Sequence, residues 1–281
     1  MHSESFRAMG TTVTVTLEDA IPPIKVRNLF EHVEQVCSRF LDHSELNRVN
    51  RSSQTTMDVS PLLADVLAVA NTARRLTGGL VDPAVGQLVA AWGYDRTFSE
   101  VRDLDEPPLV PPTDTEWRVE GSRLYRPQGV HLDLGGIAKG WTADLAVELG
   151  LATIVNAGGD LRSVHPDTIV DIDDPSGGVA ASVRVGNGAL ATSSIAKRAW
   201  MVGDRRAHHI IDPRTGAPGA TPIVSASVLA DQAALAEAGA KAILLLGEEG
   251  LSWADEQNWI RGAIVVWQDG SVYATTGTRV A

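Results

Sequence analysis

The run His131–Gly140 carries the residues best suited to chemistry in this chain. Asp133 precedes the pair Gly135–Gly136, and Lys139 follows it. Glycines let a backbone approach a ligand closely, and the free N–H groups at a helix start favour an anion. A lysine in a first helical turn is unfavourable unless a phosphate or a carboxylate lies beside it. The run is therefore a candidate anion site, and a plain turn with a solvated lysine is the alternative.

A second candidate is the run His208–Gly216, with the sequence HHIIDPRTG. The pattern predicts a hairpin strand that leads into an Asp-Pro turn. His208 and His209 fall on opposite faces of such a strand, so they do not easily bind one metal ion together. The alternative to a functional role is a turn in which Asp212 accepts a hydrogen bond from its own backbone.

Glu237 and Lys241 form a third candidate because they stand four residues apart on a predicted helix. The simplest interpretation is a surface salt pair of small value. However, the helix is apolar on nearly every side, which predicts burial. A buried pair is costly without further partners, so a ligand or metal ion nearby becomes a reasonable hypothesis.

The elements that must position these residues follow from the hydrophobic periodicity and from turn residues. Ser60-Pro61 predicts a helix start, with Gly78-Gly79 as its end. The mixture of hairpins and helices predicts an α+β fold without a clear linker or repeat. The Pro-rich, acidic stretch 104–114 is expected to be a surface loop. Strands are predicted over 10–17, 130–134, 153–156, 200–202, 209–211, 223–229, 264–267 and 272–274, and helices over 25–40, 61–77, 137–149 and 232–246.

Composition excludes some partners and locations. The formal net charge is −11, which disfavours nucleic acid because an acidic surface repels the phosphate backbone. No stretch approaches the length of a membrane span, and no signal pattern or lipid-attachment cysteine stands at the start. We expect a cytoplasmic protein. The single cysteine, Cys37, lies in an apolar-periodic stretch and is expected to be buried and structural.

Taken in order, these segments resemble the ApbE family of FAD:protein FMN transferases over nearly the whole chain. No G-x-x-x-x-G-K-[ST] loop, G-x-S-x-G elbow or dinucleotide fingerprint competes with this interpretation. The order of the motifs carries the resemblance: Met9-Gly10-Thr11, Ser38-Arg39-Phe40, Ser44-Glu45-Leu46 to Asn50, Gly78 to Gly86, Trp92-Gly93-Tyr94, Leu132 to Gly140, Asn156 to Arg162, Ala191-Thr192-Ser193 and His209 to Gly216.

The resemblance implies one ApbE-like, T-fold-related domain over 1–281, with antiparallel sheets, packed helices and FAD in a cleft between two intertwined lobes. Phe40 stands where an aromatic residue, usually tyrosine, stacks on the flavin; the stacking is retained and the phenol hydrogen bond is lost. Core packing is the alternative role for Met9 and Phe40. The residues that would line the FAD site by position are Met9, Phe40, Leu80, Val81, Asp82, Asp133, Lys139 and Ile211.

The metal site is where the sequence departs from the family. The resemblance implies Mg²⁺ on the Gly136 carbonyl, an aspartate and, one helical turn later, a threonine. Glu237 and Lys241 occupy the last two positions, and Ala240 replaces a frequent extra aspartate. Glutamate still offers an oxygen ligand, whereas a protonated lysine repels the ion. Lys241 is therefore expected either to leave the metal site weak or to take the place of the metal.

The resemblance further implies transfer of FMN from FAD to a threonine or serine hydroxyl of an acceptor protein, with release of AMP. Such phosphoryl transfer depends on positioning and charge neutralisation, to which Lys139 would contribute. Asp133 and His209 are both candidate bases. Two alternatives stay open: an FAD pyrophosphatase that produces FMN and AMP, and a non-catalytic FAD-binding protein.

Overall fold

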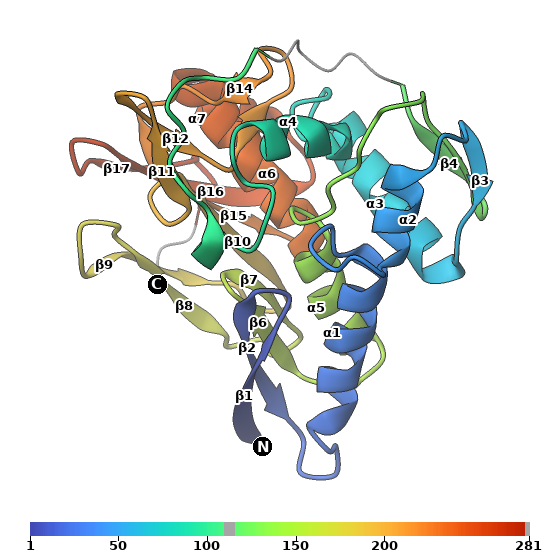
Figure 1. The fold of residues 1–281 in the computed structure, drawn as a ribbon. Coiled ribbons are helices and arrows are strands. Elements are labelled where there is room, and N and C mark those ends of the chain that lie inside the picture. The colour runs from blue at the N-terminus through green and yellow to red at the C-terminus, as the bar shows by residue number, and fades with distance from the viewer. Residues whose placement is uncertain (110–115, 279–281) are drawn as a thin grey trace. The chain divides into compact units, whose positions relative to one another are not determined.

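The computed structural model describes residues 1–109 and 116–278 (Figure 1). The chain forms two compact units, and each is assembled from separate stretches. The first contains Met1–His32, Ile137–Ser194 and Ala220–Ala281, and the second contains Val33–Gly136 and Ile195–Gly219. The part of the predicted 104–114 loop from residue 110 onward lies outside the described residues. No helix of the described part is long and apolar enough to cross a membrane.

The first unit is built on an eight-stranded sheet whose neighbouring strands are all antiparallel. Burial alternates along strands such as β2, because successive side chains of a strand point to opposite faces of the sheet. The apolar side chains of one face can therefore be buried together in the core. The strand order is β1 (His2–Ala8), β2 (Thr11–Leu17), β6 (Ile154–Ala157), β7 (Asp160–Ser163), β10 (Gly188–Ser194), β15 (Ile223–Ala230), β16 (Ile260–Trp267) and β17 (Val272–Ala274).

Helices α5 (Ala138–Glu148), α6 (Ala233–Leu246) and α7 (Gly250–Glu256) belong to this unit, together with residues 24–32 of helix α1 (Ile24–Cys37). Helices α5 and α6 contact each other and the sheet, α6 along β10 and β15 and α5 along β6 and β7 (Figure 1). Helix α6 is buried on nearly every side, as its composition predicts. A short 3-10 turn, η3 (Gly247–Glu249), follows α6, and β8 (Ile169–Asp173) and β9 (Val179–Arg184) form a separate hairpin.

Gly140 explains how closely helices α5 and α6 pack. A Cβ atom at this position would lie 2.6 Å from the backbone nitrogen of Ala234 and 2.7 Å from the carbonyl carbon of Ala233. Only a residue without a side chain permits that approach, so the last glycine of the His131–Gly140 run sets the spacing of the two helices.

The second unit is formed by shorter elements. Ser60 accepts a hydrogen bond from the Leu63 N–H and Pro61 begins helix α3, which confirms the predicted start. Residues 33–37 of helix α1 (Ile24–Cys37) belong here, and Cys37 is buried as expected, with its thiol pKa raised by burial to about 12. The other elements are α2 (Glu45–Arg51), β3 (Thr56–Asp58), α3 (Pro61–Leu76), η1 (Pro83–Val85), α4 (Gly86–Ala91), η2 (Phe98–Glu100), β4 (Arg118–Glu120), β5 (Arg123–Tyr125), β11 (Ala199–Val202), β12 (Arg205–His208), β13 (Ile211–Asp212) and β14 (Ala217–Pro218).

The predicted strand over 130–134 is wrong. This stretch pairs with no strand of the described chain, and other groups take several of its hydrogen bonds. The Asn50 side chain exchanges two bonds with the backbone of Leu132, and the Asp133 N–H donates to the Pro83 carbonyl at 2.7 Å. The predicted hairpin near residue 200 exists, but its second strand is β12 and ends at His208 rather than covering 209–211.

Candidate functional site

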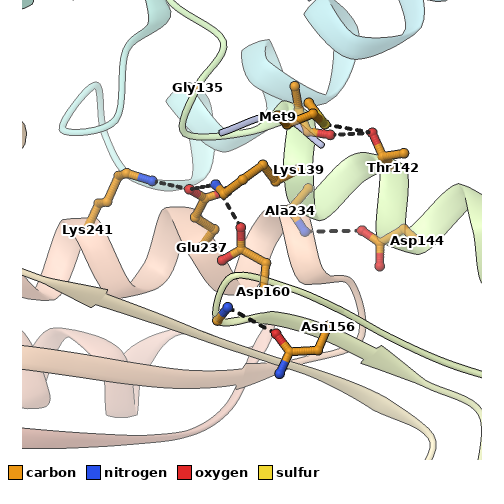
Figure 2. Close-up of polar contacts among 12 residues, drawn as sticks. Met9, Gly135, Lys139, Thr142, Asp144, Asn156, Asp160, Ala234, Glu237 and Lys241 are labelled. Atoms are coloured by element: carbon orange, nitrogen blue, oxygen red, sulfur yellow. Dashed lines mark hydrogen bonds and ion pairs between the residues drawn. The ribbon is translucent and has the colours of Figure 1, made fainter. Parts of the chain in front are cut away.

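Four charged side chains of the first unit meet above its sheet: Lys139, Asp160, Glu237 and Lys241 (Figure 2). The Lys139 Nζ lies 2.9 Å from Oδ2 of Asp160 and 3.1 Å from Oε1 of Glu237. The Lys241 Nζ lies 2.7 Å from the same Oε1 of Glu237. We call these four residues the charge cluster. Two ammonium groups and two carboxylates make it formally neutral.

Three different elements hold the charge cluster in place. Lys139 is in the first turn of α5, Asp160 begins β7, and Glu237 and Lys241 lie one turn apart on α6. The turn before Asp160 is fixed by Asn156, whose side-chain oxygen accepts the Gly159 N–H at 3.0 Å. The carboxylates beside Lys139 explain the lysine at a helix start, which was one of the two predicted explanations.

Burial gives the charge cluster its electrostatic character. The side chains of Asp160 and Glu237 are 4% and 6% exposed, and those of Lys139 and Lys241 are 11% and 15% exposed. Burial raises the pKa of Asp160 to about 7, an effect that the negative charge of Glu237 strengthens. Burial also acts to raise the pKa of Glu237, but the two ammonium groups prevail and lower it to about 2. Glu237 is therefore held as the ionised partner of both lysines.

Asp144 supports the charge cluster from helix α5. Its two carboxylate oxygens accept the backbone N–H groups of Ala233 and Ala234 at 2.8 and 3.1 Å, where helix α6 begins. Figure 2 shows the contact with Ala234. The carboxylate thus caps α6 although it comes from another helix, which complements the positive end of the helix dipole. Burial raises the pKa of Asp144 to about 6, and Arg162 lies 3.7 Å away.

In the second unit, Asp133 forms an ion pair with Arg39 at 2.7 Å. Its other oxygen accepts the Gly135 N–H at 2.7 Å, which shapes the glycine turn. The Arg39 guanidinium carbon lies 4.2 Å from the Phe40 ring centre and 4.7 Å from that of Tyr94. Phe40 remains 36% exposed, so it is not a core residue, although the Arg39 guanidinium lies over its ring.

Asp82 is an organising residue of the second unit. Its side chain is 8% exposed and accepts Arg74 at 2.8 Å and both the Trp117 indole N–H and the Ala84 N–H at 2.9 Å. These contacts occupy both carboxylate oxygens. The predicted role of Asp82 at an FAD site stays a prediction. In that role, Asp82 would fix the loop around it rather than contact FAD with a free oxygen.

The two neighbouring histidines have different environments. His208 is buried and contacts the Gly219 carbonyl at 3.0 Å, and burial lowers its pKa. His209 is half-buried, lies edge-on to Tyr94 at 6.4 Å between ring centres, and contacts the Arg198 carbonyl at 3.4 Å. Asp212 accepts the Arg214 N–H at 2.9 Å, as the simple turn interpretation predicts. His209 is the more accessible of the pair.

The remaining predicted site residues are distributed over both units. Met9 and Gly10 form the turn of the β1–β2 hairpin, and Met9 has φ of 49°, a conformation that side chains rarely adopt. A two-residue hairpin turn of type I′ requires positive φ at both central residues, and Gly10, with φ of 69°, is the other one, so the turn accounts for this conformation. Leu80 is buried, Val81 is half-buried, and Ile211 is packed in the core cluster of the second unit. Gly136 is the last residue of the first stretch of the second unit, Val33–Gly136.

Four polar residues of these sites were not predicted: Asp160, Asp144, Arg39 and Arg74. Asp160 and Arg39 lie inside sequence runs that carry the resemblance. A charged residue directly next to glycines or to an aromatic residue could have marked both as site residues. Asp144 and Arg74 lie within helices, and nothing in their spacing indicates a cap or an ion pair with a distant residue.

The donor set of the charge cluster does not fit a magnesium ion. Mg²⁺ requires near-octahedral oxygen ligands. Oxygen Oε1 of Glu237 already contacts two ammonium groups, and Oε2, which is buried without a hydrogen-bond partner among the described residues, is a single available oxygen and too few for such a ligand set. No group of three or more histidine, cysteine, aspartate or glutamate side chains within residues 1–109 and 116–278 is arranged to hold a metal ion.

The molecule is thus an α+β protein with a buried charge cluster at the start of helix α5. The model of the ApbE family matches residues 9–264, and the chain belongs to this family. An FAD:protein FMN transferase of Rhodobacter capsulatus is 32% identical over 99% of this chain and 57% of its own length. One from Vibrio cholerae is 30% identical over 87% of this chain and 79% of its own length. The chain spans little more than half of the Rhodobacter relative.

Solved structures agree with the family assignment. The ApbE protein of Thermotoga maritima superposes with a TM-score of 0.86 and 26% identity, covering 98% of this chain and 97% of the other. The flavin transferase ApbE of Vibrio cholerae gives a TM-score of 0.79 with 26% identity over 98% of this chain and 97% of the other. These comparisons confirm the predicted family and its α+β fold.

Proposed function

We propose that this protein is an FAD:protein FMN transferase. The observation that carries the proposal is the family match over residues 9–264, together with relatives named for this activity. FAD is the substrate, and a threonine or serine of another protein is the acceptor. The predicted cytoplasmic location is tested separately by cell fractionation.

The reaction is a phosphoryl transfer. The acceptor hydroxyl oxygen attacks the phosphorus on the FMN side of FAD, and a P–O bond forms while the bond to the AMP phosphate breaks. AMP leaves with the electron pair, and the hydroxyl proton passes to a base. Because the chemistry consists of positioning and charge neutralisation, a few fixed cationic and polar groups are sufficient.

Several of this chain's residues suit these tasks. Lys139 has its ammonium group at the start of α5, where an anion also gains from the helix dipole. The exposed Phe40 ring suits stacking on an isoalloxazine ring. Of the two predicted bases, His209 is half-buried and Asp133 is already ion-paired with Arg39. We therefore assign the proton to His209.

Incubation of the purified protein with FAD and the proteins of its own host tests the proposal. We expect a flavin-fluorescent band on a denaturing gel, with FMN attached to threonine or serine by mass spectrometry, and AMP in the supernatant. Free FMN with AMP would mean a pyrophosphatase, and unchanged FAD would mean a binding protein. The variant His209→Ala should lose the band, whereas His2→Ala, a change at the first residue of strand β1, should retain it.

A further inference from the structure

We propose that the Lys241 ammonium group is the resident cation of the charge cluster and excludes a divalent metal ion from it. The family resemblance implies Mg²⁺ at this position, and the described donor set does not fit it. The proposal concerns metal binding by the ligand-free protein. Only its last test, with a chelator, rests on the proposed function.

The first argument is the balance of charge. Asp160 and Glu237 bring two buried carboxylates, and Lys139 and Lys241 bring two ammonium groups. Buried charges persist only when they are compensated. Lys241 already supplies one of the two positive charges that compensate these carboxylates, whereas a neutral residue at position 241 would remove that charge and leave the position open to another cation.

The second argument is geometric. The Lys241 Nζ lies 2.7 Å from Oε1 of Glu237, so a metal ion on this carboxylate would be close to the ammonium nitrogen. Like charges at that separation repel strongly where water is scarce. Lys241 is also held in place: it shares the buried helix α6 with Glu237 at a separation of four residues, and its side chain is 15% exposed. Figure 2 shows both lysine ends directed at Glu237.

The third argument is that Glu237 already has its counter-charges in contact. Its Oε1 lies 3.1 Å from the Lys139 Nζ and 2.7 Å from the Lys241 Nζ. The carboxylate therefore has its counter-charges within the protein, and a metal ion would have to displace one of them. A neutral oxygen-bearing residue at position 241 would remove that competition and add a ligand of the kind Mg²⁺ prefers.

Manganese titration followed by electron paramagnetic resonance tests the proposal, because protein-bound Mn²⁺ loses the sharp signal of the free ion. The ligand-free wild-type protein and the Lys241→Arg variant should show no Mn²⁺ binding that is lost when Glu237 is replaced by glutamine. Lys241→Thr should bind about one Mn²⁺, and Glu237→Gln in that background should abolish it. Lys241→Ser serves as a second neutral variant, and circular dichroism checks that each variant is folded.

Two results would overturn the proposal. One is wild-type binding of Mn²⁺ that Glu237→Gln removes. The other is folded Lys241→Thr and Lys241→Ser proteins that bind no more Mn²⁺ than the wild type, since position 241 would then not control the site. In the chelator test, FAD consumption by the wild type should be unchanged in excess EDTA, and loss of at least tenfold would also overturn the proposal. If FAD is never consumed, the proposed function fails, and the manganese result still decides this one.

Discussion

At the scale of single residues, the charge cluster shows how burial changes ordinary side chains. Glu237 is held ionised by two lysines, whereas burial and the neighbouring Glu237 charge raise the pKa of Asp160. A raised carboxyl pKa means that the folded state keeps a proton that the unfolded state releases. Its stabilising effect is complete below the unfolded pKa and is lost as the pH rises through the folded value. For Asp160 that window runs from 3.8 to about 7.

We expect Lys241→Met to make stability more sensitive to alkaline pH. Removing one ammonium group raises the pKa of Asp160 further, because Lys241 contributes to lowering it. Between pH 7 and 9 the folded variant would then hold a proton that the unfolded chain lacks. Each such proton lowers the free energy of unfolding by about 1.4 kcal/mol per pH unit. Urea unfolding at a series of pH values measures this slope.

The wild type and Lys197→Met, a change at an exposed lysine, should show a flatter profile over the same range. Parallel profiles for all three proteins would contradict the assignment of Lys241 as the compensating charge of the charge cluster.

We expect Lys139→Ala to weaken binding of FAD more than binding of FMN or riboflavin. A cation at the start of α5 favours the diphosphate over the flavin ring. Fluorescence titration with the three flavins gives the three dissociation constants. A loss of roughly tenfold for FAD corresponds to about 1.4 kcal/mol. Equal losses for all three flavins would instead indicate a contact with the ring or a change in the fold.

At the scale of elements, helix α6 depends on a cap that comes from another helix. Asp144 accepts two N–H groups at the start of α6, and Gly140 lets the two helices approach at that point. Helices are more commonly capped by the residue directly before their first turn. Here the N–H groups of the first turn of α6 have their acceptor only when α5 lies in its observed position. Helix α6 also carries Glu237 and Lys241.

We expect Asp144→Ala to lower the free energy of unfolding by about 2–4 kcal/mol, because two buried N–H groups lose their acceptors. Glu148→Ala, which removes an exposed carboxylate from the same helix, should cost less than about 0.5 kcal/mol. Denaturant unfolding of both variants measures the difference. Similar values for the two would show that the cap contributes little.

At the scale of the whole molecule, binding of FAD to the folded state alone should stabilise the chain. A ligand at 100 times its dissociation constant adds about 2.7 kcal/mol. We expect the melting temperature to rise by several degrees with saturating FAD, and to remain unchanged with MgCl₂ alone at the same ionic strength. Differential scanning fluorimetry read by tryptophan emission measures both. No shift with FAD would contradict the predicted FAD site.

The sequence by itself determined the family, the α+β class and most of the elements, because those follow from local signals. Ser60-Pro61 starts a helix, the apolar face of α6 predicts its burial, and the order of motifs identifies the family. Local patterns gave one wrong prediction, the strand over 130–134. The side chain of Asn50, which is distant in sequence, forms the hydrogen bonds with the Leu132 backbone that a neighbouring strand would have formed.

Only the tertiary structure decided which charges meet. Sequence spacing placed Glu237 beside Lys241, since four residues are one helical turn. It did not bring Lys139 and Asp160 to the same carboxylate, because these residues come from a different helix and from a strand. The α5–α6 contact at Gly140 and the turn before Asp160 create that meeting. Since burial and counter-charge depend on packing, the ionisation of the charge cluster and its poor fit to a metal ion follow from the fold.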